Sequence, residues 1–187
     1  MAHAFTVHAE ATESDYFTVV DDLTAEAGEA GSAGLFDTEL TAGLFYGYVV
    51  LDLPLLIDNL GGDAALAGKV AEHLTHLVAT VSPGAKKGST APYAFAETML
   101  IESGRRQPRT LANAFRTPVD ARMEKAEAAL RDYLSRVDNV YGNGETRRHL
   151  ALSNSDLPGS QLGTLAGLAE FARNEVQGVV VPEKTSV

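Results

Sequence analysis

The segment from Asp15 to Tyr48 most strongly limits how this chain can fold. It begins as an apolar, β-prone run at 16–20, continues through an acidic part rich in Gly and Ala, and returns at Leu44 as an aromatic strand. Aromatic and β-branched residues favour strands, whereas acidic, Gly-rich sequence buries too little apolar surface to form a core. The pattern therefore predicts a long protrusion, residues 10–42, that leaves a sheet and returns to it.

Three further strands are expected around this protrusion. Ala2–His8 carries β-compatible residues and predicts a short strand at the start of the sequence. Leu44–Leu53 is apolar at both alternating sets of positions, which is typical of a central, covered strand. Gly47 inside this run indicates a bulge or a close approach by another group. A third apolar run, Thr98–Ile101, predicts another strand.

Three helices are expected. Asp63 can cap the first, which runs to about Val81, and its apolar stripe is expected to pack on the sheet. The second should begin with Thr117 as N-cap and end at Gly142, and the third should begin at Thr164. The residues of the first stripe are Leu66, Val70, Leu74, Leu77, Val78 and Val81.

This order of elements predicts an α+β fold with an antiparallel or mixed sheet and helices on one face. It is similar to a ferredoxin-like or RNA-recognition-motif-like arrangement with one edge absent. We expect a single domain over 1–176, with a helical C-terminal part at 117–176 and a flexible tail at 177–187. The 187 residues and 45% hydrophobic content are sufficient for one core.

Acidic residues are concentrated in the first part of the chain. The formal net charge is −10, and no Lys or Arg precedes Lys69. A basic surface is the usual mark of a protein that binds nucleic acid, so the total charge argues against that class and the distribution indicates an acidic, partner-facing or solvated surface. The twelve acids before Lys69 are Glu10, Glu13, Asp15, Asp21, Asp22, Glu26, Glu29, Asp37, Glu39, Asp52, Asp58 and Asp63.

Metal-dependent chemistry has two candidate residue pairs. His73 and His76 lie three positions apart in a helix, and Asp21 and Asp22 are adjacent carboxylates. Zinc needs three or four convergent ligands, and His73 and His76 have no acidic residue one turn away on their face. The more common explanation for both pairs is a solvent-exposed surface, and we expect no metal and no cofactor.

Basic residues gather at two loops. Lys86 and Lys87 lie between glycines, where exposed amides and ammonium groups can hold phosphates, and a solvated turn explains them equally well. The same two interpretations apply to Arg105, Arg106 and Arg109.

Phe17, Thr18 and Leu35 are difficult to place in a core because they flank the acidic tip of the protrusion. Apolar side chains on a protrusion can wedge between nucleic-acid bases without any Lys or Arg. A small satellite cluster beneath the loop is the simpler interpretation from the pattern alone.

Other classes of protein find no support in the sequence. There is no Cys, which excludes disulfides and thiolate sites. The first residues lack the features of a signal peptide, and no window is long and apolar enough to span a membrane. The expected location is cytoplasmic. Nucleophile-elbow, P-loop and dinucleotide-binding motifs do not occur.

Several long motifs, in order, resemble one family. They are AHAFTVHAEATESDYFTVVDDL, GSAGLFDTELTAGLFYGYVVLDLPLLIDNLGG, PGAKKGSTAPYA and LANAF. The chain is similar, from Ala2 to about Asn174, to the C-terminal half of CasC, the repeating backbone subunit of type I-E CRISPR Cascade, in the RAMP superfamily.

The resemblance implies a palm with a protruding thumb that folds over guide RNA and kinks out its bases, without catalysis. It implies contact with neighbouring copies, other Cascade subunits and, through the guide, target DNA. Phe17, Thr18 and Leu35 match the positions at the displaced base, and Lys86 and Lys87 remain the expected phosphate contacts.

Two departures from the family pattern bear on function. The first palm strand, the basic helix after it and the fingers domain have no counterpart here, which leads us to expect a truncated subunit. Gly47 stands where some relatives carry a basic residue. The alternatives are a metal-dependent nuclease and an acidic protein-interaction module.

Overall fold

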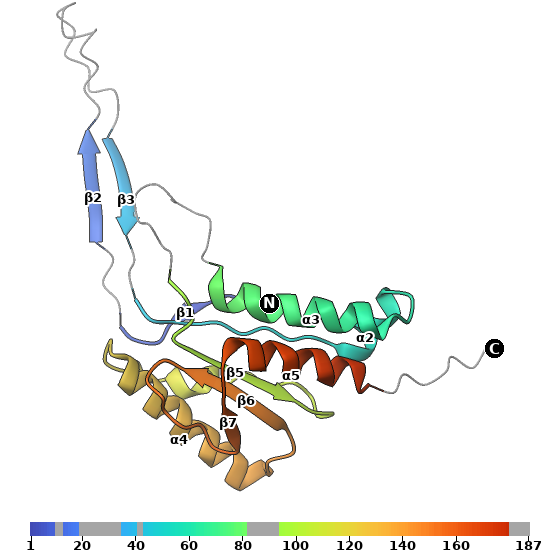
Figure 1. Cartoon of the computed structure of the whole chain (residues 1–187). Helices are drawn as coiled ribbons and strands as arrows, with labels where there is room; N and C mark the ends of the chain where they lie inside the picture. Colours follow the sequence, from blue (N-terminus) through green and yellow to red (C-terminus); the bar gives the residue numbers. More distant parts are fainter. Residues whose placement is uncertain (10–12, 19–34, 41–42, 82–93, 180–187) are drawn as a thin grey trace, which may run out of the picture.

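The computed structural model describes residues 1–9, 13–18, 35–40, 43–81 and 94–179. Figure 1 shows a body of helices and strands from which one β-hairpin extends. Within the described residues the body contains a three-stranded sheet, a two-stranded pair, four α-helices and one 3-10 helix. The α+β fold class expected from the sequence is confirmed.

The three-stranded sheet forms the centre of the body. β5 (Thr98–Ser103) pairs antiparallel with β6 (Thr146–Ala151), which pairs parallel with β7 (Ser160–Leu162), so the sheet is mixed. The sequence predicted β5 but not β6 or β7. Residues 117–176, expected to be helical, therefore also contribute two strands.

Helices cover both faces of this sheet, whereas one covered face was expected. On one face the Thr98 hydroxyl donates to Glu127 of α4 (Met123–Tyr141) at 2.6 Å. On the other face the Ser103 hydroxyl donates to Glu175 of α5 (Leu165–Gln177) at 2.6 Å. Because strand side chains alternate between faces, residues 98 and 103 reach opposite layers.

A shorter pair of strands lies beside the central sheet. β1 (Phe5–Thr6) pairs antiparallel with β4 (Phe45–Tyr46). The predicted strand at Leu44–Leu53 is therefore wrong in its extent: beyond Tyr46 the chain runs on without strand pairing to α2 (Leu53–Asn59). α2 was not predicted from the sequence; Asp52 caps it by accepting from the Leu55 amide at 3.0 Å.

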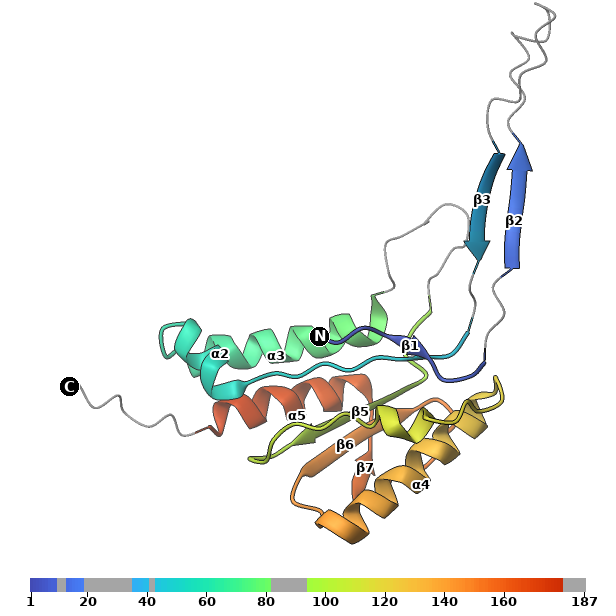
Figure 2. The same ribbon diagram turned by 180° about the vertical axis from the view of Figure 1, so that it is seen from behind.

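The hairpin that leaves the body consists of β2 (Glu13–Thr18) and β3 (Leu35–Leu40), paired antiparallel. It extends away from the helices and the central sheet in both views (Figures 1 and 2). The sequence pattern predicted a protrusion over 10–42. The described strands β2 and β3 lie within that range, and residues 10–12, 19–34 and 41–42 lie outside the described residues.

α3 (Ala64–Thr80) confirms the cap at Asp63, whose carboxylate accepts from the Leu66 amide at 2.8 Å. The predicted packing face is wrong. Leu66, Leu77 and Val81 are exposed, by 44%, 54% and 62%, because a face of small residues packs on α5 instead. Small residues let two helices approach closely. That face consists of Ala67, Gly68, Ala71, Thr75 and Ala79.

The start of α4 also differs from the prediction. The helix begins at Met123, not at Pro118, and a short 3-10 helix, η1 (Ala112–Phe115), precedes it. The reason is that the Val119 amide donates to the Val7 carbonyl at 3.0 Å, which holds that residue beside β1 in an extended conformation. Gly142, with a φ of 78°, ends the helix as expected. Thr164 caps α5 as expected, accepting from the Gly167 amide.

Candidate functional site

The three candidate residues of the protrusion lie on the hairpin. Thr18 and Leu35 are register partners, and Phe17 occupies the next position of the ladder, opposite Phe36. Because β2 points away from the body, these pairs form the end of the ladder farthest from the body (Figure 1). Residues separated by 16 intervening positions are thus adjacent, which sequence spacing alone does not establish.

The base of the hairpin is held by His8, which is 8% exposed. Its Nε2 accepts from the Leu44 amide at 3.1 Å, so the ring proton sits on Nδ1, which donates to the Ala9 carbonyl at 2.9 Å. The Val7 amide donates to the Leu44 carbonyl at 3.0 Å. One buried imidazole therefore joins the two chain segments that lead into the hairpin.

Two candidate pairs lie outside the described residues: Lys86 with Lys87, and Asp21 with Asp22. His73 and His76 are both exposed on α3. Among the described side chains, no group of three or more His, Asp or Glu residues is placed to hold a metal ion. The described residues therefore supply no site for the metal-dependent alternative.

Two arginines of the basic turn after β5 form ion pairs with carboxylates of the same domain. Arg106 donates to both oxygens of Glu145, at 2.8 and 2.6 Å, and to the carbonyls of Tyr141 and Gly142. Arg109 contacts Glu145 and Glu102, each at 3.1 Å. These two arginines close the end of α4 over the sheet, so they do not form an open anion site. Arg105 remains exposed.

A fully buried arginine completes this cluster. The Arg147 side chain is 0% exposed and donates to Asp138 at 2.5 and 2.7 Å and to Glu102 at 2.7 Å. Burial lowers the pKa of Arg147, but the hydrogen bonds to the two carboxylates outweigh that effect and raise it. The guanidinium therefore stays charged and fixes β6 to α4 and β5.

The cluster also controls the protonation of Glu145. Its hydrogen bonds from Arg106 lower the pKa of this carboxyl to about 2, against the opposing effect of burial. The same contact raises the pKa of Arg106. Three arginines thus face three carboxylates across short ion pairs, which leaves little positive field for a phosphate.

Two buried polar groups were not singled out in the sequence. Glu127 is 3% exposed and accepts from the hydroxyls of Thr98 and Ser153. Burial raises its pKa, but those hydrogen bonds outweigh it and lower the pKa below the ordinary value. His149 is 0% exposed, and its Nε2 donates to the Ser155 carbonyl while Nδ1 accepts from Ser160. The alternation of buried residues along β6 was the signal that could have located His149.

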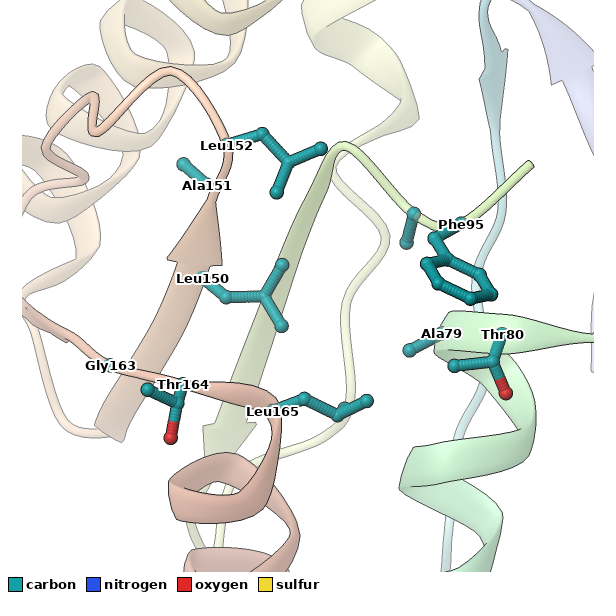
Figure 3. A pocket seen from close by; sticks show the side chains of 10 residues that line it. Ala79, Thr80, Phe95, Leu150, Ala151, Leu152, Gly163, Thr164 and Leu165 are labelled. Carbon is teal, nitrogen blue, oxygen red and sulfur yellow. The ribbon is translucent and has the colours of Figure 1, made fainter.

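An apolar hollow of about 260 Å³ lies between the end of α3, β6 and the start of α5. Figure 3 shows Leu150 and Leu165 directed into it, with Phe95 at its edge. Phe95 is 72% exposed. The residues that line the hollow are uncharged, so this feature has no group that would bind phosphate.

The described helices include none long and apolar enough to cross a membrane. The geometry as a whole defines an α+β domain whose charged cluster is paired around the buried Arg147 and whose most prominent external feature is a β-hairpin (Figure 1).

The CT1975-like protein family matches residues 1–173, so this chain belongs to that family. The family assignment confirms the resemblance found in the sequence.

Two solved structures are similar to nearly all of this chain. One, described as a CRISPR RNA-guided surveillance complex, has a TM-score of 0.81 and 28% identity over 92% of this chain and 68% of its own. The other, described as a CRISPR RNA-guided surveillance complex, pre-nicking, has a TM-score of 0.82 and 28% identity over 94% of this chain and 49% of its own. A search of curated proteins found no match.

Proposed function

We propose that this chain is a non-catalytic backbone subunit of a CRISPR surveillance complex that contacts guide RNA through the β2–β3 hairpin. The observation that carries the proposal is the hairpin itself, with Thr18 paired to Leu35 at its outer end and Phe17 beside them. In this proposal the hairpin is the thumb of a type I-E subunit, and the central sheet belongs to its RNA-recognition-motif-like palm.

The proposed mechanism is mechanical and not chemical. Apolar side chains that enter between two bases unstack them and bend the strand, and such a wedge needs no cation. Phe17, Thr18 and Leu35 would supply the wedge. Lys86 and Lys87 would contact phosphates beside it. The guide would then pair with target DNA between wedges, and neighbouring copies and other subunits would complete the complex.

The arrangement of charges predicts weak RNA binding by the isolated chain. Five arginines make ion pairs with carboxylates, namely Arg106, Arg109, Arg122, Arg147 and Arg173. Each phosphate contact on a single strand contributes about −0.7 to the slope of log affinity against log salt concentration. Because these five of the fifteen basic residues are engaged and none of the fifteen precedes Lys69, the hairpin itself supplies no cation, and that slope should be shallow.

Fluorescence of 2-aminopurine in the guide RNA tests the wedge. We expect high fluorescence at displaced positions in a complex assembled with the wild-type chain, because an unstacked 2-aminopurine is not quenched. Phe17→Ala combined with Leu35→Ala should lower the fluorescence at those positions. Val140→Ala provides the control, since this residue is 73% exposed on α4 and distant from the hairpin.

Equal fluorescence from the hairpin variant and the wild-type complex would refute the wedge. A complex that assembles around the variant with normal guide content separates this outcome from a failure of assembly. Lys86→Glu with Lys87→Glu should lower guide affinity in the same assay while Lys125→Glu on α4 leaves it unchanged.

A further inference from the structure

The loop between α4 and β6 contains the dipeptide Asn143–Gly144. It is the only place in the chain where a glycine follows one of the six asparagines. An asparagine deamidates when the backbone nitrogen of the next residue attacks its Cγ, and glycine hinders that attack least because it has no Cβ and few restrictions on φ and ψ. Both residues are exposed and belong to no helix or strand. The pair is therefore open to water and to the backbone rotation that the attack requires.

The backbone nitrogen of Gly144 donates to no acceptor within the described parts of the chain. On the helical side of the loop, the Gly142 amide donates to the Asp138 carbonyl at 2.9 Å. On the other side, the pairing of β6 with β5 begins only at Thr146. The proton of the Gly144 amide can therefore be removed without breaking an internal hydrogen bond, which favours attack by its nitrogen.

The Arg106 guanidinium lies directly against Gly144. A Cβ built on Gly144 would be 3.1 Å from both Cζ and Nε of Arg106. The guanidinium is held there by the carbonyls of Tyr141 and Gly142, at 2.9 and 3.0 Å, and by the Glu145 carboxylate at 2.6 Å. A fixed positive charge stabilises an adjacent nitrogen that has lost its proton. Arg106 therefore favours the reactive form of the Gly144 amide while it holds the residues on both sides of the loop.

We propose that Asn143 is a site of spontaneous deamidation, and this inference is independent of the role proposed for the hairpin. The Gly144 nitrogen loses its proton and forms a bond to Cγ of Asn143. The bond from Cγ to Nδ2 then breaks, and the nitrogen leaves as ammonia with the returned proton. Water opens the resulting succinimide at Cγ to give aspartate, or at the backbone carbonyl to give isoaspartate. The step consumes water, releases ammonia and needs no oxidant or reductant.

Isoaspartate changes the loop that Arg106 holds closed. Its backbone passes through the former side-chain carbon, which lengthens the chain between Gly142 and Glu145 by a methylene group. Arg106 donates to both of these residues, at 3.0 and 2.6 Å, so a longer segment between them separates or distorts the two contacts. Both products also add a negative charge to a chain whose formal net charge is −10. Deamidation therefore loosens the end of α4 as the protein ages.

Peptide mapping of the whole chain by mass spectrometry tests the proposal. The chain is incubated at pH 8 and 37 °C, and the conversion of amide to carboxylate is followed at each asparagine. We expect Asn143 to convert about tenfold or more faster than Asn154, which is also exposed but precedes a serine. Methylation by a protein-isoaspartate methyltransferase detects the isoaspartate product, and Asn143→Gln should remove that signal.

Hydrogen exchange at Gly142 tests the consequence for the loop. Anion-exchange chromatography separates the deamidated chain because it carries an additional negative charge. Its Gly142 amide should exchange several-fold faster than that of the unmodified chain, because the last turn of α4 opens. Freshly purified Asn143→Asp adds the charge without lengthening the backbone, so its Gly142 amide should exchange as slowly as in the unmodified chain. Circular dichroism verifies that each variant is folded.

Three results would overturn the proposal. The first is conversion of Asn143 that is no faster than that of Asn154. The second is conversion more than about a hundredfold slower than in a synthetic peptide of residues 141–145, because the fold would then protect the site. The third is equal exchange of the Gly142 amide in the modified and unmodified chains, because the modification would then leave the loop closed.

Discussion

Arg147 and Asp138 form a doubly hydrogen-bonded ion pair in the interior, with N–O distances of 2.5 and 2.7 Å. Replacing Arg147 with Met should lower the free energy of unfolding by about 3–5 kcal/mol, because Asp138 and Glu102 lose their buried partner. Urea denaturation measures the change. Arg105→Met, at an exposed position in the turn after β5, should change the value by less than about 0.5 kcal/mol. Equal effects of the two substitutions would contradict this role of Arg147.

The free energy of unfolding should fall in acid because Glu145 becomes protonated. Its pKa in the folded chain is about 2, below the ordinary value of 4.5, so its contribution is fully present above about pH 4.5. That contribution, on the order of 3 kcal/mol, is lost as the pH falls toward 2. Urea denaturation between pH 7 and 2 should therefore show a smaller loss for Glu145→Gln than for the wild type. Identical pH dependence would contradict the assignment.

Gly68 controls how closely α3 packs on α5. A Cβ there would lie 3.1 Å from Cγ of Arg173 and 3.2 Å from the Arg173 carbonyl oxygen. Gly68→Ala should therefore lower the melting temperature, with a cost of about 1–3 kcal/mol for overpacking. Gly167→Ala on α5 is the matched control. Its Cβ meets only Thr164 at 3.5 Å, so it should stabilise by roughly 0.5–1 kcal/mol. The same sign for both would contradict the close contact.

His8 should determine the order at the base of the hairpin. His8→Leu removes the acceptor of the Leu44 amide and leaves a part-buried donor unpaired, at a cost of about 1–3 kcal/mol. We expect faster hydrogen exchange at Leu44 in this variant. His3→Leu provides the control because His3 is exposed. Unchanged exchange at Leu44 would show that the imidazole is not its partner.

The sequence correctly predicted helices and strands wherever a local feature, such as a helix cap or an apolar run, determines the structure. Asp63 and Thr164 cap the helices that the sequence assigned to them, and β5 follows its apolar run. The packing face of α3 could not be predicted from the local pattern. Hydrophobicity indicates a buried face made of its large apolar residues, whereas the contact with α5 requires small residues. That choice depends on a neighbour more than 90 residues away in the sequence, as the contact of Gly68 with Arg173 shows.

Long-range pairing explains the other differences. Val119 lies beside Val7 through a backbone hydrogen bond, which overrides the local helix signal at Thr117 and Pro118. In the sequence Arg106 and Arg109 were candidates for an anion site, but in the folded chain they form ion pairs with Glu102 and Glu145. At the hairpin, the pattern predicted the protrusion, and only the register shows that Thr18 and Leu35 are partners.

Photo-crosslinking within an assembled surveillance complex tests the central claim most directly. The chain is co-assembled with a guide RNA that carries 4-thiouridine, irradiated and digested, and crosslinked peptides are identified by mass spectrometry. We expect the main crosslinks to fall in Glu13–Thr18 and Leu35–Leu40, the two strands of the hairpin. A complex that contains the chain and guide RNA but yields crosslinks only to the helical body would contradict it.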